Sequence, residues 1–142
     1  MIAYCDTSAL MKLFVLEQHS DWMQQQAQAS QRLLVSLLTW TEMLAALALK
    51  QRTGQIDVTQ LTLALQQLEQ AWPRYHQIDV KTGQVAEAGR LALRFGLRAY
   101  DSLQLASAWH AHQQLGHNMV FLSFDKQLNA AAASLGLAVQ TP

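Results

Sequence analysis

Apolar and polar positions along this chain form two kinds of segment, short continuous runs and longer periodic stretches. The periodic stretches place apolar residues three and four positions apart, which is the spacing of one helix face. The continuous runs have the length of buried strands, and they are Ile2–Cys5, Leu33–Leu37, Tyr75–Val80, Met119–Ser123 and Leu137–Gln140. Strands that alternate with helices predict an α/β fold in three layers, with a mostly parallel central sheet of about four to five strands flanked by helices.

The periodic stretches also carry signals for where each helix begins and ends. Ser20 is expected to cap the second helix, and Pro73 is expected to end the fourth. The predicted helices are Ser8–Val15, Asp21–Ser30, Thr41–Arg52, a segment from Asp57 or Thr59 to Trp72, Thr82–Phe95, Arg98–Leu115 and Asp125–Leu135. The two helices between Thr41 and Trp72 have a short connection, so we expect them to form an antiparallel hairpin.

Length and composition limit the class of protein. A chain of 142 residues, with 51% hydrophobic and 14% charged residues, is typical of one globular domain spanning residues 1–142. Cys5 is the single cysteine, which excludes an internal disulfide and fits a reducing compartment. No signal peptide or apolar run of membrane-spanning length is present in the sequence, so we expect a cytoplasmic protein.

The formal net charge is zero, because ten basic residues balance ten acidic ones. Nucleic-acid binders are usually basic, so this balance counts against a large phosphate-binding surface. The balance changes if four of the ten acids share one metal site, since six acids then face ten bases over the rest of the surface.

Four acids occupy equivalent places in the predicted fold. Asp6 and Asp125 each follow a strand directly, while Glu42 and Asp101 lie in the first turns of predicted helices. Each one alone is explained by the preference of acids for helix N-termini. In a parallel α/β sheet, however, the helices that follow strands begin at the same edge. We therefore expect the four carboxylates to converge there.

Four converging carboxylates repel one another unless a cation neutralises them. Oxygen ligands suit Mg²⁺ or Mn²⁺, and such ions stabilise the attacking and leaving oxygens in phosphodiester hydrolysis. Thr7, Ser8 and Ser123 are candidates to bind a phosphate oxygen or a metal-bound water, although backbone hydrogen bonding explains Ser123 equally well. Arg98, the last of three arginines spaced four residues apart, is a candidate phosphate ligand, and a solvated helix face explains it about as well.

Four segments in order, MIAYCDTSALMKLF, SLLTWTEML, GLRAYDSLQLASA and FLSFDKQLNAAAASLGL, resemble the PIN-domain nucleases, and most of all the VapC-like toxins of bacterial toxin–antitoxin pairs. The resemblance implies a PIN-like fold and a metal-dependent endoribonuclease that uses Mg²⁺ or Mn²⁺. It maps the catalytic and metal-binding acids of the family onto Asp6, Glu42, Asp101 and Asp125. It also implies an RNA substrate, a VapB-like antitoxin and a homodimer. Ser102 departs from the alanine that more commonly follows the third acid.

Three other interpretations remain. A catalytically silent PIN-like binding protein is the main alternative, and metal binding through Asp101 would distinguish it from a nuclease. A haloacid-dehalogenase-like phosphotransferase also begins with an Asp after its first strand, but it needs a second acid where this chain has Ser8. A response-regulator receiver expects adjacent acids after the first strand, which are absent. For an antitoxin, the expected contacts are Trp22, the Leu13-Phe14 pair and the helical hairpin.

Overall fold

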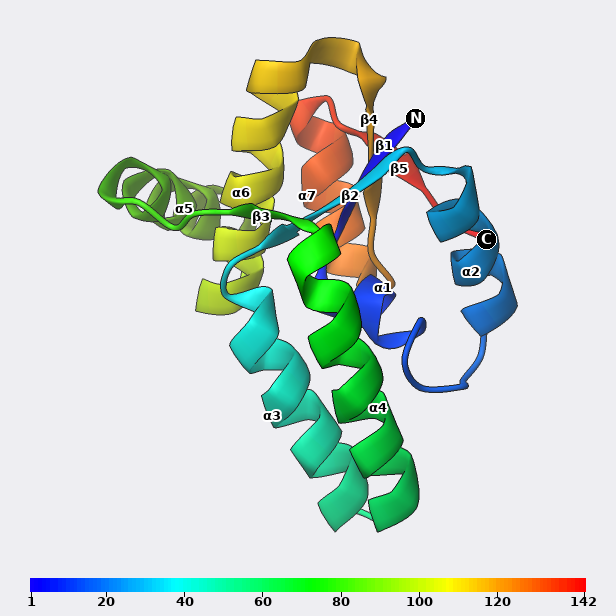
Figure 1. Cartoon of the computed structure of the whole chain (residues 1–142). Coiled ribbons are helices and arrows are strands. Elements are labelled where there is room, and N and C mark those ends of the chain that lie inside the picture. The colour runs from blue at the N-terminus through cyan, green and yellow to red at the C-terminus, as the bar shows by residue number, and fades with distance from the viewer.

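The structure is a computed structural model that describes residues 1–142, apart from the side chain of His117. Five parallel strands form one sheet in the order β3-β2-β1-β4-β5, with helices on both faces (Figure 1). The strands are β1 (Ile2–Cys5), β2 (Arg32–Ser36), β3 (His76–Ile78), β4 (Met119–Leu122) and β5 (Ala138–Gln140). The α-helices are α1 (Thr7–Met11), α2 (Ser20–Ala29), α3 (Thr39–Arg52), α4 (Val58–Ala71), α5 (Thr82–Phe95), α6 (Ala99–Leu115) and α7 (Lys126–Leu135). The predicted three-layer α/β fold with a parallel sheet is confirmed.

Two hydrophobic cores cover the two faces of the sheet, because successive side chains of a strand point to opposite faces. Tyr4 of β1 packs with α5, α6 and α7, and its ring stacks on Phe121 with a centroid distance of 5.8 Å. Ala3 and Cys5 of the same strand pack with α1, α2, α3 and α4. Both faces of the central strands are therefore buried, which explains why these strands are continuously apolar.

The carboxyl edge of the sheet is the edge at which the functional side chains gather. β1 lies between β2 and β4, and the backbone N–H of Asp6 extends the ladder to Leu122 O at 3.1 Å. Helices α1, α3 and α7 follow β1, β2 and β4 and begin at this edge. Helix α6 also begins there, although it follows a helix, because the chain turns at Gly96 with a left-handed φ of 66°.

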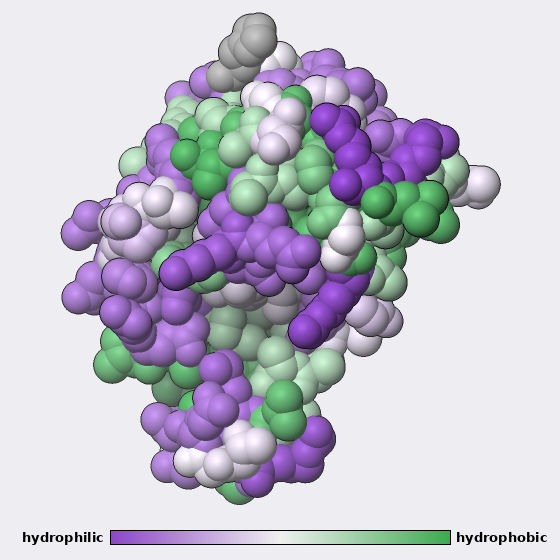
Figure 2. Space-filling model, turned by 180° about the vertical axis from the view of Figure 1, so that it is seen from behind, coloured by the Kyte–Doolittle hydropathy of each residue, from purple (hydrophilic) through white to green (hydrophobic). Residues whose placement is uncertain are grey.

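Helices α3 and α4 form the predicted hairpin, which extends beyond the carboxyl edge of the sheet (Figure 1). Asp57 caps α4 by accepting a hydrogen bond from the Gln60 backbone N–H at 2.7 Å, and the Gln60 side chain accepts one from the Asp57 N–H at 2.8 Å. Seen from behind, the hairpin tip at the bottom of Figure 2 is largely hydrophilic, with isolated hydrophobic residues. Among the described residues, no helix has the length and apolar character needed to cross a membrane.

Two local predictions are wrong. Helix α1 ends at Met11 and not at Val15, because Lys12 and Leu13 donate to the carbonyls three residues before them, which tightens the last turn. Ser20 is not the cap of α2 but its first residue. Its hydroxyl accepts from Glu17 N at 3.0 Å and donates to Val15 O at 3.2 Å, and it therefore ties down the loop that precedes the helix.

Candidate functional site

A cleft of about 370 Å³ opens at the carboxyl ends of β1 and β4. Its walls come from α1 and the loop after it, α3, the first turns of α6, and the β4–α7 junction. All four acids expected from the sequence line this cleft. The lining residues are Asp6, Thr7, Ser8, Met11, Lys12, Glu17, Glu42, Ala46, Lys50, Asp101, Gln104, Phe124 and Asp125.

Asp6 is the most deeply buried of the four acids, with only 4% of its surface exposed. Its Oδ1 accepts hydrogen bonds from the Ser8 hydroxyl at 2.7 Å and from the Ala9 backbone N–H at 2.9 Å, so it also caps α1. Its Oδ2 accepts from the Ser123 hydroxyl at 2.6 Å. Burial raises the pKa of Asp6 to about 6, and these three hydrogen bonds act in the opposite direction.

Glu42 is held by Gln104, a side chain that the sequence analysis did not single out. The Gln104 Nε2 donates to Glu42 Oε1 at 2.8 Å and to the Thr39 hydroxyl at 2.9 Å, while its Oε1 accepts from the Tyr4 hydroxyl at 2.7 Å. A longer contact of 3.3 Å joins the same Nε2 to the Thr7 hydroxyl. One buried amide therefore connects α6 with β1, α1 and α3.

The charge of Asp101 acts on both Asp6 and Glu42, whose pKa values it helps to raise, though less than burial does. Burial raises the pKa of Asp101 itself, and the charge of Asp125 raises it further. Arg98 opposes this rise. Asp101 is thus electrostatically coupled to the three other acids, and all four line the same cleft.

Asp125 is the N-cap of α7, as Asp6 is the N-cap of α1. Its side chain accepts from Leu128 N at 2.9 Å, and its own N–H donates to the Ser123 hydroxyl at 3.1 Å. The Ser8 hydroxyl in turn accepts from Phe124 N at 2.9 Å. Ser8 and Ser123 therefore bridge the two strand ends that carry Asp6 and Asp125.

The chain matches the family model for the PIN domain over residues 3–134. It belongs to the PIN domain family. Ribonuclease VapC45 of Mycobacterium tuberculosis is 28% identical over 138 residues, which cover 97% of this chain and 94% of that protein.

Solved structures show the same fold. PAE2754 of Pyrobaculum aerophilum has a TM-score of 0.66 and 23% identity, with 98% of this chain and 83% of that one covered. A chain in a toxin–antitoxin complex from Klebsiella pneumoniae has a TM-score of 0.65 and 20% identity, with 98% and 96% covered.

This PIN domain has the donor chemistry for a divalent cation, since its cleft presents carboxylate and hydroxyl oxygens, the ligands that Mg²⁺ prefers. Among the described side chains, no three His, Cys, Asp or Glu residues stand close enough to enclose an ion by themselves. A cation would also reduce the mutual repulsion of the four acids.

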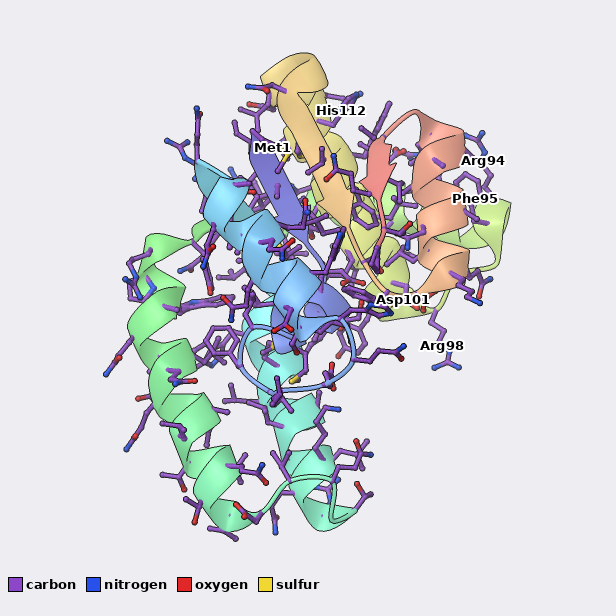
Figure 3. The ribbon with its side chains drawn as sticks, turned by 90° about the vertical axis from the view of Figure 1, so that its right-hand side faces the viewer. Met1, Arg94, Phe95, Arg98, Asp101 and His112 are labelled. Carbon is purple, nitrogen blue, oxygen red and sulfur yellow. The ribbon has the colours of Figure 1, made fainter. Side chains whose placement is uncertain are left out.

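The candidate substrate-binding residues have different surroundings. Ser8 and Ser123 have their hydroxyls directed to Asp6, and Thr7 accepts from Gln104. In this arrangement Ser8 and Ser123 hold Asp6, and Thr7 contacts the amide that holds Glu42. Arg98 is exposed and points away from the body of the protein, whereas Asp101 lies closer to the cleft (Figure 3).

Three residues at the site were missed, namely Gln104, Glu17 and Lys50. Gln104 could have been found from its position, because it lies three residues after Asp101 and therefore on the same side of α6. Glu17 and Lys50 line the cleft together with Lys12, which closely follows Asp6 in sequence and was a weaker candidate for that reason. No local pattern predicts that grouping, since it depends on how the α1–α2 loop folds against α3.

Proposed function

We propose that this PIN domain is a divalent-metal-dependent endoribonuclease and the toxin of a toxin–antitoxin pair. The observation that supports it most is the convergence of Asp6, Glu42, Asp101 and Asp125 on one cleft at the carboxyl edge of the sheet. Family membership adds to it, because PIN-domain nucleases generally depend on divalent metal ions. The relative at 28% identity is named a ribonuclease, which agrees with the same activity.

Asp6, Asp101 and Asp125 are the residues that would hold Mg²⁺ or Mn²⁺, with Glu42 as a further ligand or as the group that orients the attacking water. When bound, the cation supplies charge neutralisation at the phosphate and a position for that water. Gln104 fixes the carboxylate of Glu42 through the 2.8 Å hydrogen bond. Attack of water forms a new P–O bond and breaks the bond to the 3′ oxygen, which leaves with a proton. The products carry a 5′-phosphate and a 3′-hydroxyl.

The antitoxin is a protein that covers the hairpin and the loop after α1. Large hydrophobic side chains are exposed in this region, with 89% of Leu16, 63% of Val58, 53% of Leu63 and 51% of Leu49 accessible. These apolar side chains on α3, α4 and the loop after α1 are accessible for contact with a protein partner. A solved structure of the same fold is a toxin–antitoxin complex, which supports such a partner. Trp22, the other expected contact, is half-buried against Phe124.

The nuclease is tested by incubating total cellular RNA with the purified chain, freed of any antitoxin, in Mg²⁺ or Mn²⁺. Asp101→Asn should reduce cleavage at least about a hundredfold, because loss of a metal-binding carboxylate removes several kcal/mol of transition-state stabilisation. EDTA should abolish cleavage. Asp79→Asn is the matched control, since Asp79 is an exposed acid outside the cleft. A 2′,3′-cyclic phosphate at the product ends would contradict hydrolysis by water.

A catalytically silent binding module is the second candidate. It is favoured by one observation, namely that both oxygens of Asp6 already accept hydrogen bonds. Calorimetric titration with Mn²⁺ separates the two. The nuclease should bind Mn²⁺ and lose that binding in Asp101→Asn, whereas a folded silent module should show no binding that depends on Asp101.

A further inference from the structure

Two lysines share one glutamate on the wall of the cleft. Lys12 Nζ and Lys50 Nζ each lie 3.2 Å from a different carboxylate oxygen of Glu17. The three residues come from the end of α1, the loop that follows it, and the end of α3. Lys50 lies 33 positions after Glu17 in sequence, so the fold brings the three residues together.

The two lysines differ in what their ammonium groups can still bind. Lys12 also donates to Gln18 O at 2.8 Å and lies over the Phe124 ring at 4.4 Å, and only 11% of its side chain is exposed. Lys50 also donates a long hydrogen bond of 3.4 Å to Gln55, and 21% of its side chain is exposed. An ammonium group has three donor hydrogens. Among the described residues each ammonium group donates two hydrogen bonds, but Lys12 also lies against the Phe124 ring, so Lys50, the more exposed of the two, is the one open to a ligand.

Lys50 belongs to a stripe of α3 that faces the cleft. Glu42, Ala46 and Lys50 all line it, and their spacing of four residues places them on one side of the helix. Ala46 is small and leaves the floor of the cleft open between the two charged residues. The eight residues from Glu42 to Lys50 correspond to about 12 Å of helix. Lys50 therefore lies on the same side of α3 as Glu42 but farther along the cleft from the acids.

We propose that Lys50 binds a phosphate of the RNA strand beside the one that is cleaved, and that Glu17 and Lys12 are positioning residues that hold Lys50 in place. This inference rests on the proposed nuclease function. The cleft is otherwise acidic, with five carboxyl groups against two ammonium groups among its lining residues. An extended anionic strand therefore needs a cationic contact on this wall, and Lys50 supplies it next to an open floor.

The test measures how the affinity for RNA depends on salt. A labelled single-stranded RNA of about twelve nucleotides is titrated by fluorescence anisotropy, in Mg²⁺, at several salt concentrations. Every protein carries Asp101→Asn, so that the RNA stays intact. Lys50→Met is compared with Lys81→Met, which removes the same charge from an exposed residue outside the cleft.

We expect Lys50→Met to lower the slope of log affinity against log salt concentration by about 0.7, the value for one lost phosphate contact on a single strand. Lys81→Met should leave the slope unchanged, and Lys50→Arg should restore it. An unchanged slope in folded Lys50→Met would overturn the assignment. Absence of RNA binding in the Asp101→Asn reference would overturn this inference, while the nuclease is judged by cleavage with the unsubstituted chain.

Failure of the nuclease alone is recognised separately, because cleavage by the unsubstituted chain is measured in parallel. RNA binding that depends on Lys50, in a chain that does not cleave, would support the phosphate contact and reject the enzyme.

Glu17→Gln tests the positioning role with Asp101 intact. Its RNA affinity at low salt should be at least that of the unsubstituted chain, because an acid is removed, while kcat should fall several-fold as Lys50 loses its orientation. An unchanged kcat would contradict that role.

Discussion

The acid cleft differs sharply from a second, larger cavity in the same molecule. That cavity measures about 940 Å³ and lies between β2, β3, the beginning of α5 and the end of α6. Its charged residues are mostly at the surface, and its buried glutamine, Gln84, makes a local contact to Lys81 N. In the acid cleft, by contrast, Gln104 joins side chains 62 to 100 positions away in sequence. Long-range polar contacts at the strand ends, and not volume, mark the site.

Of the substitutions that distinguish the acid cleft from the larger cavity, Gln104→Met should have the largest effect. Gln104→Met removes the hydrogen bonds of Gln104 to the Tyr4 hydroxyl and to Thr39, and each lost hydrogen bond costs about 0.5–1.5 kcal/mol of folding free energy. It also frees Glu42, so RNA cleavage should fall about tenfold to a hundredfold. The melting temperature and kcat are measured together.

Gln113→Met is the matched control for Gln104, because Gln113 is an exposed glutamine of the same helix that lines the larger cavity. Its cleavage and melting temperature should stay close to those of the unsubstituted chain. If Gln104→Met is less stable but cleaves at the normal rate below its melting temperature, Gln104 contributes to folding and not to cleavage.

A smaller effect is expected from the charge of Asp6 when metal is chelated. Its pKa is raised from 3.8 unfolded to about 6 folded, so the folded chain binds more protons between these values. The free energy of unfolding should then decrease as pH rises from about 4 to about 6, by up to about 3 kcal/mol. Asp6→Asn should remove most of this slope. Urea unfolding in EDTA measures it.

In Mg²⁺ the free energy of unfolding should decrease less as the pH rises. A cation bound by the folded state stabilises that state, and it offsets the charge of the acids above about pH 6. Asp57→Asn is a suitable control, because Asp57 is an exposed helix cap and asparagine caps equally well. If the free energy of unfolding of the unsubstituted chain did not change between about pH 4 and about pH 6, the pKa of Asp6 would not be raised by folding, and the prediction would be contradicted.

The convergence of the four acids was predictable because strand length and helix starts are local signals, and the parallel sheet aligns them. The limits of α5 were predicted at both residues, since Gly96 ends the helix in a left-handed conformation. Gln104, Glu17 and Lys50 were not found. Their roles depend on contacts between α6, α3 and the α1–α2 loop, and a single sequence does not record which polar side chains meet across a core.

The smallest effect on stability and on RNA cleavage is expected from a substitution in the larger cavity. His110 is exposed and lines it, on the part of α6 beyond the acid cleft. His110→Ala should change the free energy of unfolding by no more than about 0.5 kcal/mol, as is usual for exposed positions, and should leave cleavage unchanged. Total RNA digestion beside Asp101→Asn measures the contrast directly. Loss of cleavage in His110→Ala would mean that RNA contacts both cavities, and that the functional surface extends along α6 from its first turn to its last.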